Sequence, residues 1–97
     1  MNCKSEMEYQ IEFTEALKNR GWLTFGIVHP PQPGYPDVEA FKDGRCAIFE
    51  IKKRGGRLSP EQERMHKLLR GHGVYVYVVS SPASAEAVLN MLDERFG

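Results

Sequence analysis

The sequence has little cysteine, no long apolar run and no excess of charge of either sign. Its two cysteines, Cys3 and Cys46, are too few for a disulfide framework or a cysteine-based zinc site. No apolar run approaches the roughly 18–20 residues that a membrane span requires. The first residues also have no apolar segment typical of a secretory signal. We therefore expect a protein of a reducing, intracellular compartment that does not enter a membrane.

Charge is balanced overall, with 13 basic and 13 acidic residues. This balance argues against a polycation that coats nucleic acid without specificity. The charges are nevertheless unevenly distributed, because residues 42–72 carry nine basic and four acidic side chains while both flanks are acidic. This basic island, residues 42–72, requires a functional explanation.

Length and composition predict one globular domain, residues 1–97. A chain of 97 residues can bury one core, and a hydrophobic content of 41% is too high for disorder. Ser59-Pro60-Glu61-Gln62 combines an N-cap serine, a proline at the first helical position and the glutamine of a capping box. Asp43-Gly44 is a strong hairpin signal. We expect helices over 5–20, 59–70 and from Ser81-Pro82 onwards, and strands over 22–28, 37–42, 45–53 and 74–79.

The element order, αβββαβα, predicts an α/β fold with a small mixed sheet. The first three strands would form an antiparallel meander, and a right-handed helical crossover would make the fourth strand parallel to the third. Helices would flank both faces of this sheet.

The third expected strand carries charged residues at its end. Side chains two apart on a strand share a face, so Glu50 and Lys52 point the same way. The hairpin places Asp37 opposite residue 50, within a residue or so. Two opposed carboxylates repel each other unless a positive charge lies between them, and oxygen ligands suit Mg²⁺ or Mn²⁺. The alternative is that Glu50 and Lys52 form a solvated pair at the end of a half-exposed strand.

Several segments together resemble a known family. Gly34-Tyr35-Pro36-Asp37 followed by Phe49-Glu50-Ile51-Lys52 is similar to the bipartite signature of the PD-(D/E)XK nuclease superfamily. With the link 55–62 (GGRLSPEQ) and the segment 73–76 (GVYV), the chain resembles the small stand-alone VRR-NUC domains of bacteria and their phages. The resemblance covers roughly residues 6–92. It implies a restriction-endonuclease-like αβββαβ core, in agreement with the element order.

The resemblance also implies a metal site. Asp37 and Glu50 would bind Mg²⁺ or Mn²⁺, the backbone carbonyl of Ile51 would complete the protein ligands, and Lys52 would serve the attacking water.

Two further catalytic residues are implied, each with an alternative. Gln62 matches the family's glutamine on the crossover helix, but glutamine at this position also caps a helix for local reasons. Glu6 matches the family's acidic residue on the first helix, with Glu8 as the competing choice and an exposed helix position as the third possibility. Glu39 departs from the apolar residue usual in the family, and is either a solvated edge residue or part of a second, weaker metal position.

A phosphate backbone next to this site would explain the basic island. The residues expected to bind nucleic acid are Lys53, Arg54, Arg57 and Arg64. For Arg64 the alternative is a solvated helix face. His66 and His72 are expected at the surface, because no pair of histidines has metal-ligand spacing with a third ligand.

The resulting hypothesis is a Mg²⁺- or Mn²⁺-dependent DNA endonuclease. Because no segment resembles a base-reading helix, we expect selectivity for branched, flap or junction DNA. A catalytically silent DNA-binding module of the same fold is the alternative, and an enzyme acting on a non-nucleic substrate is a third. Small resolvase-like nucleases with this core commonly pair, so we expect a homodimer with two-fold symmetry. The expected location is the cytoplasm of a bacterial or phage-infected bacterial cell.

Overall fold

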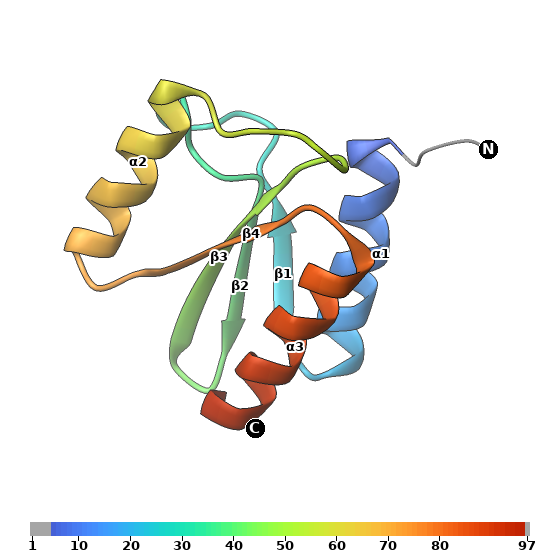
Figure 1. Cartoon of the computed structure of the whole chain (residues 1–97). Helices are drawn as coiled ribbons and strands as arrows, with labels where there is room; N and C mark the ends of the chain where they lie inside the picture. The colour runs from blue at the N-terminus through green and yellow to red at the C-terminus, as the bar shows by residue number, and fades with distance from the viewer. Residues whose placement is uncertain (1–4, 97) are drawn as a thin grey trace.

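A computed structural model describes residues 5–96, which form three helices and a four-stranded sheet (Figure 1). The helices are α1 (Glu6–Asn19), α2 (Pro60–Gly71) and α3 (Pro82–Phe96), and the strands are β1 (Leu23–Gly26), β2 (Val38–Lys42), β3 (Arg45–Ile51) and β4 (Tyr75–Val79). Cys3 lies outside the described residues, and Cys46 is a free thiol. Within the described residues, no helix is long and apolar enough to cross a membrane.

Local sequence signals start the first two helices and close the hairpin. Ser5 accepts a hydrogen bond from the Glu8 amide and Glu8 accepts one from the Ser5 amide, which makes a complete capping box at α1. Ser59 and Gln62 form the same box at α2. In the β2–β3 turn, Asp43-Gly44 has positive φ at both residues, 52° and 78°, as a tight two-residue hairpin requires.

The sheet has the strand order β1-β2-β3-β4. β1 pairs antiparallel with β2, and β2 pairs antiparallel with β3. β4 pairs parallel with β3, so the predicted mixed sheet is confirmed. In the β2–β3 pair, Val38 lies opposite Phe49. One step further along this register places Asp37 beside Glu50.

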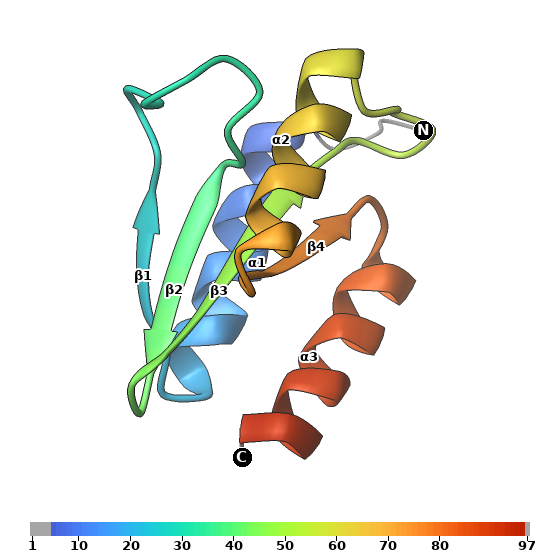
Figure 2. The same ribbon diagram turned by 90° about the vertical axis from the view of Figure 1, so that its left-hand side faces the viewer.

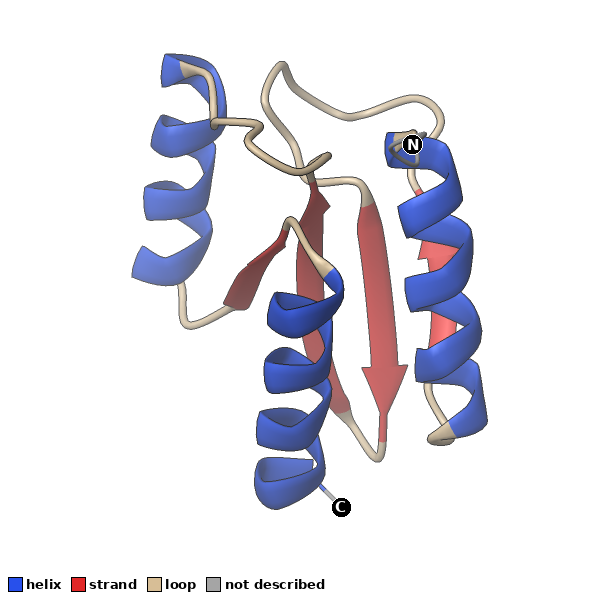
Figure 3. Ribbon diagram, turned by 45° about the vertical axis from the view of Figure 1, so that its right-hand side comes forward, coloured by secondary structure: helices blue, strands red, loops and turns tan. Residues whose placement is uncertain are grey.

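The two faces of the sheet are covered by different helices. Phe49 and Ile51 of β3 point into a core that contains Phe13 of α1 and Leu92 of α3. Figure 3 shows α1 and α3 together on this face. Alternation along β3 turns Glu50 to the opposite face, where α2 lies in front of β3 and β4 (Figure 2). The hydrophobic core therefore lies on one side of β3, and the residues of the candidate site lie on the other.

Candidate functional site

Asp37 is held directly against β3, at the point where the proline-rich loop, residues 29–36, enters β2. Its backbone amide donates to the Phe49 carbonyl at 3.0 Å. Its carboxylate oxygen Oδ2 accepts a hydrogen bond from the Ile51 amide at 2.7 Å. The carboxylate is thus fixed beside the end of β3 by backbone groups, which makes its position a consequence of the strand register.

Glu50 is a buried carboxylate, with only 1% of its surface exposed. Its pKa is raised to about 8, mainly by burial and next by hydrogen bonding to and repulsion from Asp37, while the positive charge of Lys52 opposes the shift. This burial excludes the solvated strand-end pair as a description of Glu50 and Lys52. At neutral pH and without a cation, the Asp37–Glu50 pair therefore retains a proton.

Helix α2 supplies a hydrogen-bonding group to each oxygen of Glu50. Gln62 donates from Nε2 to Oε2 at 3.3 Å, and His66 Nε2 lies 3.1 Å from Oε1. Gln62 also accepts from the Ser59 amide through its own Oε1 at 2.8 Å. One end of the Gln62 amide therefore caps the helix while the other end contacts Glu50, so its capping does not exclude a role at the site.

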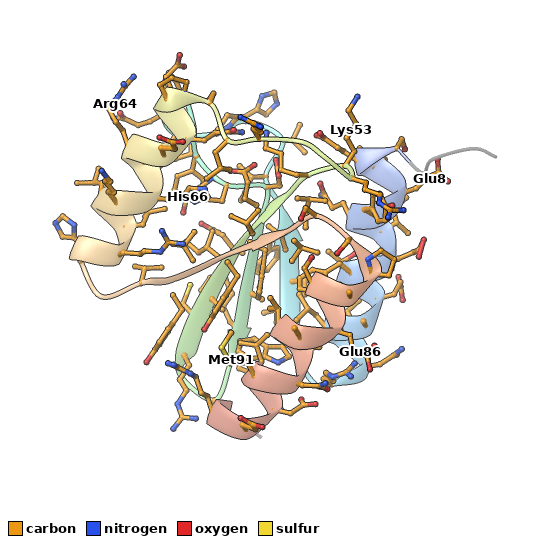
Figure 4. The ribbon with its side chains drawn as sticks, viewed as in Figure 1. Glu8, Lys53, Arg64, His66, Glu86 and Met91 are labelled. Atoms are coloured by element: carbon orange, nitrogen blue, oxygen red, sulfur yellow. The ribbon has the colours of Figure 1, made fainter. Side chains whose placement is uncertain are left out.

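His66 is the main residue that sequence reasoning missed. It was expected at the surface, and this expectation is wrong, because only 1% of it is exposed. Figure 4 shows its ring pointing from α2 towards the strands. Burial lowers its pKa, and the nearby cations Arg70 and Lys52 lower it further. The available signal was its spacing, since residue 66 is one helical turn beyond Gln62 and shares its inward face.

Lys52 lies one residue beyond β3, and its amide donates to the Val79 carbonyl at 2.8 Å. The positive charge of Lys52 acts on the site electrostatically and lowers the pKa of both Glu50 and His66. The following turn folds back on it: a Cβ at Gly56 would lie 3.4 Å from Lys52 Cβ and 2.9 Å from the Lys53 carbonyl. The glycine turn therefore allows the chain to pass close to the lysine stem.

The start of α1 distinguishes Glu6 from Glu8. Glu8 closes the capping box with Ser5. Glu6 Oε2 accepts a hydrogen bond from the Lys53 amide at 3.4 Å, and its charge contributes to the raised pKa of Glu50. Of the two acidic residues, Glu6 therefore borders the segment that follows β3.

Glu39 is partly buried rather than a solvated edge residue. The Tyr35 hydroxyl donates to its Oε2 at 2.6 Å. Burial and the Glu39 carboxylate raise the pKa of Tyr35.

The loop carrying Tyr35 is pressed against α2, since a Cβ at Gly34 would come within 2.5 Å of the Glu61 carbonyl. Gly34, with φ of 84°, is thus required by both its conformation and this close approach.

The predicted nucleic-acid-binding residues are all exposed, and they lie along the loop after β3 and on α2. Figure 4 shows Lys53 and Arg64 projecting outward from this end of the molecule. Arg64 also lines a shallow groove of about 430 Å³ with Met65 and Leu68 of α2 and Gln32 and Pro33 of the proline-rich loop. The exposed basic residues are Lys53, Arg54, Arg57 and Arg64.

The donor atoms at this site suit a hard divalent cation. Two adjacent carboxylates, one of them buried, carry more negative charge than Lys52 alone offsets when both are ionised. Among residues 5–96, no three His, Cys, Asp or Glu side chains are arranged to hold a metal ion. Asp37 and Glu50 are the carboxylates that could hold such an ion, and carboxylate oxygens suit Mg²⁺ or Mn²⁺.

Comparison with known proteins supports the fold. No family model matches the sequence, and no curated protein sequence matches it. A solved structure described as "VRR_NUC domain" superposes with a TM-score of 0.75 over 95% of this chain and 97% of that chain, at 24% sequence identity. The fold expected from the sequence resemblance is thereby confirmed: this chain has the fold of a VRR_NUC domain.

Proposed function

We propose that this protein is a Mg²⁺- or Mn²⁺-dependent DNA endonuclease that hydrolyses phosphodiester bonds. The observation that carries the proposal is the buried Glu50 carboxylate beside Asp37, at a strand end that also bears Lys52. Such a pair of carboxylates is stabilised by a cation, and a lysine at the same end can act on a substrate held there. The VRR_NUC fold is consistent with this chemistry.

Each residue has a role in this proposal. Asp37, Glu50 and the Ile51 carbonyl hold the cation. When bound, the cation supplies Lewis-acid chemistry, polarising the phosphoryl group and offsetting its developing charge. Lys52 orients or deprotonates the attacking water and adds positive charge near the phosphate. Gln62 orients Glu50 from α2.

Glu6 and the exposed cations complete the proposed site. Glu6 borders it through the Lys53 amide, and so links the start of α1 to the loop after β3. The phosphate backbone is bound by the exposed basic residues, whose charges supply affinity without reading bases. Selectivity would then come from the shape of a branch, flap or junction. The side chains concerned are Lys53, Arg54, Arg57 and Arg64.

Purified protein incubated with labelled duplex, single-stranded, flap and four-way-junction DNA is expected to nick DNA in Mg²⁺ or Mn²⁺, with branched substrates cut fastest. Cleavage should stop in EDTA and return when Mg²⁺ is added in excess. Binding without cleavage on every substrate would favour the silent DNA-binding module. Neither binding nor cleavage would point to the third class, an enzyme with another substrate.

We also propose a homodimer, supported by an exposed apolar patch on β1 and β2. α2 does not cover this part of the sheet, and Leu23, Phe25 and Phe41 are 59%, 50% and 39% exposed (Figure 2). The rings of Phe25 and Phe41 contact each other edge to face, with centroids 6.1 Å apart. Contiguous exposed apolar surface of this kind marks an interface.

Sedimentation equilibrium at micromolar concentration should therefore give a mass of about twice the 11.1 kDa of one chain. Phe41→Glu should shift the mass to that of a monomer, whereas Ile11→Glu, at an exposed position of α1, should not. A monomeric wild-type protein would contradict the dimer. The cytoplasmic location expected from the sequence stays a prediction.

A further inference from the structure

The Glu50 carboxylate is held from one side by α2. Its two oxygens each have one partner on this helix, Gln62 at Oε2 and His66 at Oε1. A carboxylate oxygen can accept two hydrogen bonds, so each oxygen retains a lone pair for other partners. Asp37 lies on the β2 side, where its hydrogen bond to the Ile51 amide fixes it. The arrangement leaves Glu50 able to face Asp37 while remaining anchored to α2.

His66 is better suited than Gln62 to fix Glu50. It is 1% exposed, whereas Gln62 is only partly buried and uses its own carbonyl oxygen as a helix cap. An imidazole has two side-chain torsions and a rigid ring, so a buried ring loses little freedom when it holds a partner. Among residues 5–96, its Nδ1 has no hydrogen-bond partner. The ring is thus oriented by its contact with Glu50 and by packing.

Helix α2 is itself anchored at both ends. Near its start, the Glu61 backbone lies against Gly34 of the proline-rich loop, closely enough that a Cβ there would clash. Near its end, Arg70 donates to the Val76 carbonyl of β4 at 3.0 Å. A donor mounted on so constrained a helix can hold Glu50 in one orientation.

We propose that His66 is a positioning residue, which donates from Nε2–H to Glu50 and presents that carboxylate, together with Asp37, to a divalent cation. This inference rests on the proposed function. Partners that orient a metal-binding carboxylate commonly change metal affinity by 10–100-fold when they are lost. His66 would therefore control cation affinity without touching the cation or the DNA.

The test is calorimetric Mn²⁺ binding to the metal-free full chain carrying His66→Gln or His66→Asn. Both variants keep a polar amide on α2. The glutamine amide nitrogen reaches the position of Nε2, and the asparagine amide stops about one bond short of it. We expect Mn²⁺ affinity within about threefold of wild type for His66→Gln and a loss of about 10–100-fold for His66→Asn. His72→Asn is the control, since His72 is exposed at the end of α2.

Thermal unfolding followed by circular dichroism establishes that each variant is folded. Folded His66→Gln and His66→Asn proteins with equal Mn²⁺ affinity would overturn the role of His66 and leave the proposed function intact. Wild-type protein that binds no Mn²⁺ would instead overturn the metal-dependent function, and this inference with it. A variant that unfolds is replaced by His66→Ser. The serine side chain is also too short to reach the position of Nε2, so this variant should show the same loss of Mn²⁺ affinity as His66→Asn.

Discussion

Glu50→Gln is expected to lose Mn²⁺ affinity, whereas Lys52→Ala is expected to lose cleavage rate. Glu50→Gln keeps the shape of the buried side chain but removes a ligand charge, so Mn²⁺ affinity should fall by about tenfold or more, and cleavage with it. Lys52→Ala leaves both carboxylates in place, and should lose roughly 10²–10⁴ in cleavage rate.

Mn²⁺ affinity in Lys52→Ala should change little, because two effects oppose each other. Removing the lysine removes a charge that repels the cation, which favours binding. It also removes the charge that lowers the pKa of Glu50, so a proton competes better for the site. Measurements at pH 8.5 reduce the second effect and should show equal or tighter binding.

Calorimetry for Mn²⁺ and single-turnover cleavage separate these outcomes. Glu86→Gln and Lys18→Ala, exposed on α3 and α1, are the matched controls and should behave as wild type. Undiminished cleavage by Lys52→Ala would refute the role of the lysine. Equal loss of Mn²⁺ affinity in both site variants would mean that Lys52 acts on the metal site rather than on the reaction.

The metal-free protein is expected to lose stability as the pH rises from about 6.5 to 8. Folded Glu50 has a pKa of about 8, against 4.5 for the unfolded chain, so the folded state holds an extra proton in this window. The Glu50 contribution to the free energy of unfolding should therefore fall by at most about 1.4 kcal/mol per pH unit, and by about 1.7 kcal/mol across the window, because Glu50 is half ionised at pH 8.

Below pH 6.5, His66 opposes Glu50. Its lowered pKa means that the unfolded chain takes up a proton which the folded state does not, and this offsets the proton held by Glu50. The two contributions therefore oppose each other below pH 6.5. The two buried groups together predict that the pH dependence of stability flattens on the weakly acidic side of pH 6.5.

Urea unfolding in EDTA across pH 4–8.5 measures this profile. Glu50→Gln should remove the decline above pH 6.5, while the exposed control Glu86→Gln should retain it. Saturating Mn²⁺ should also remove the decline, because the cation takes the place of the proton. A metal-free wild-type protein equally stable at pH 6.5 and 8 would contradict the raised pKa of Glu50.

Local sequence rules were sufficient to predict the helix starts, the hairpin turn and the placement of Asp37 beside Glu50. The capping boxes at Ser5 and Ser59 and the Asp43-Gly44 turn act over four residues or fewer, so they are legible in the sequence. The hairpin register then follows by counting, and places Asp37 beside Glu50 as predicted. Strand alternation likewise puts Glu50 on the face opposite Phe49.

The sequence by itself therefore determined the α/β order, the mixed sheet and the pairing of Asp37 with the end of β3. Only the tertiary structure decided how α2 lies on that face, and so buried His66 against Glu50 and brought Gln62 into contact with Glu50 as well as with Ser59. It also turned Glu6 rather than Glu8 towards the loop after β3 and joined Tyr35 to Glu39. The reason is physical: capping and register depend on neighbours along the chain, whereas the rotation and docking of a helix depend on the packing of segments far apart in sequence.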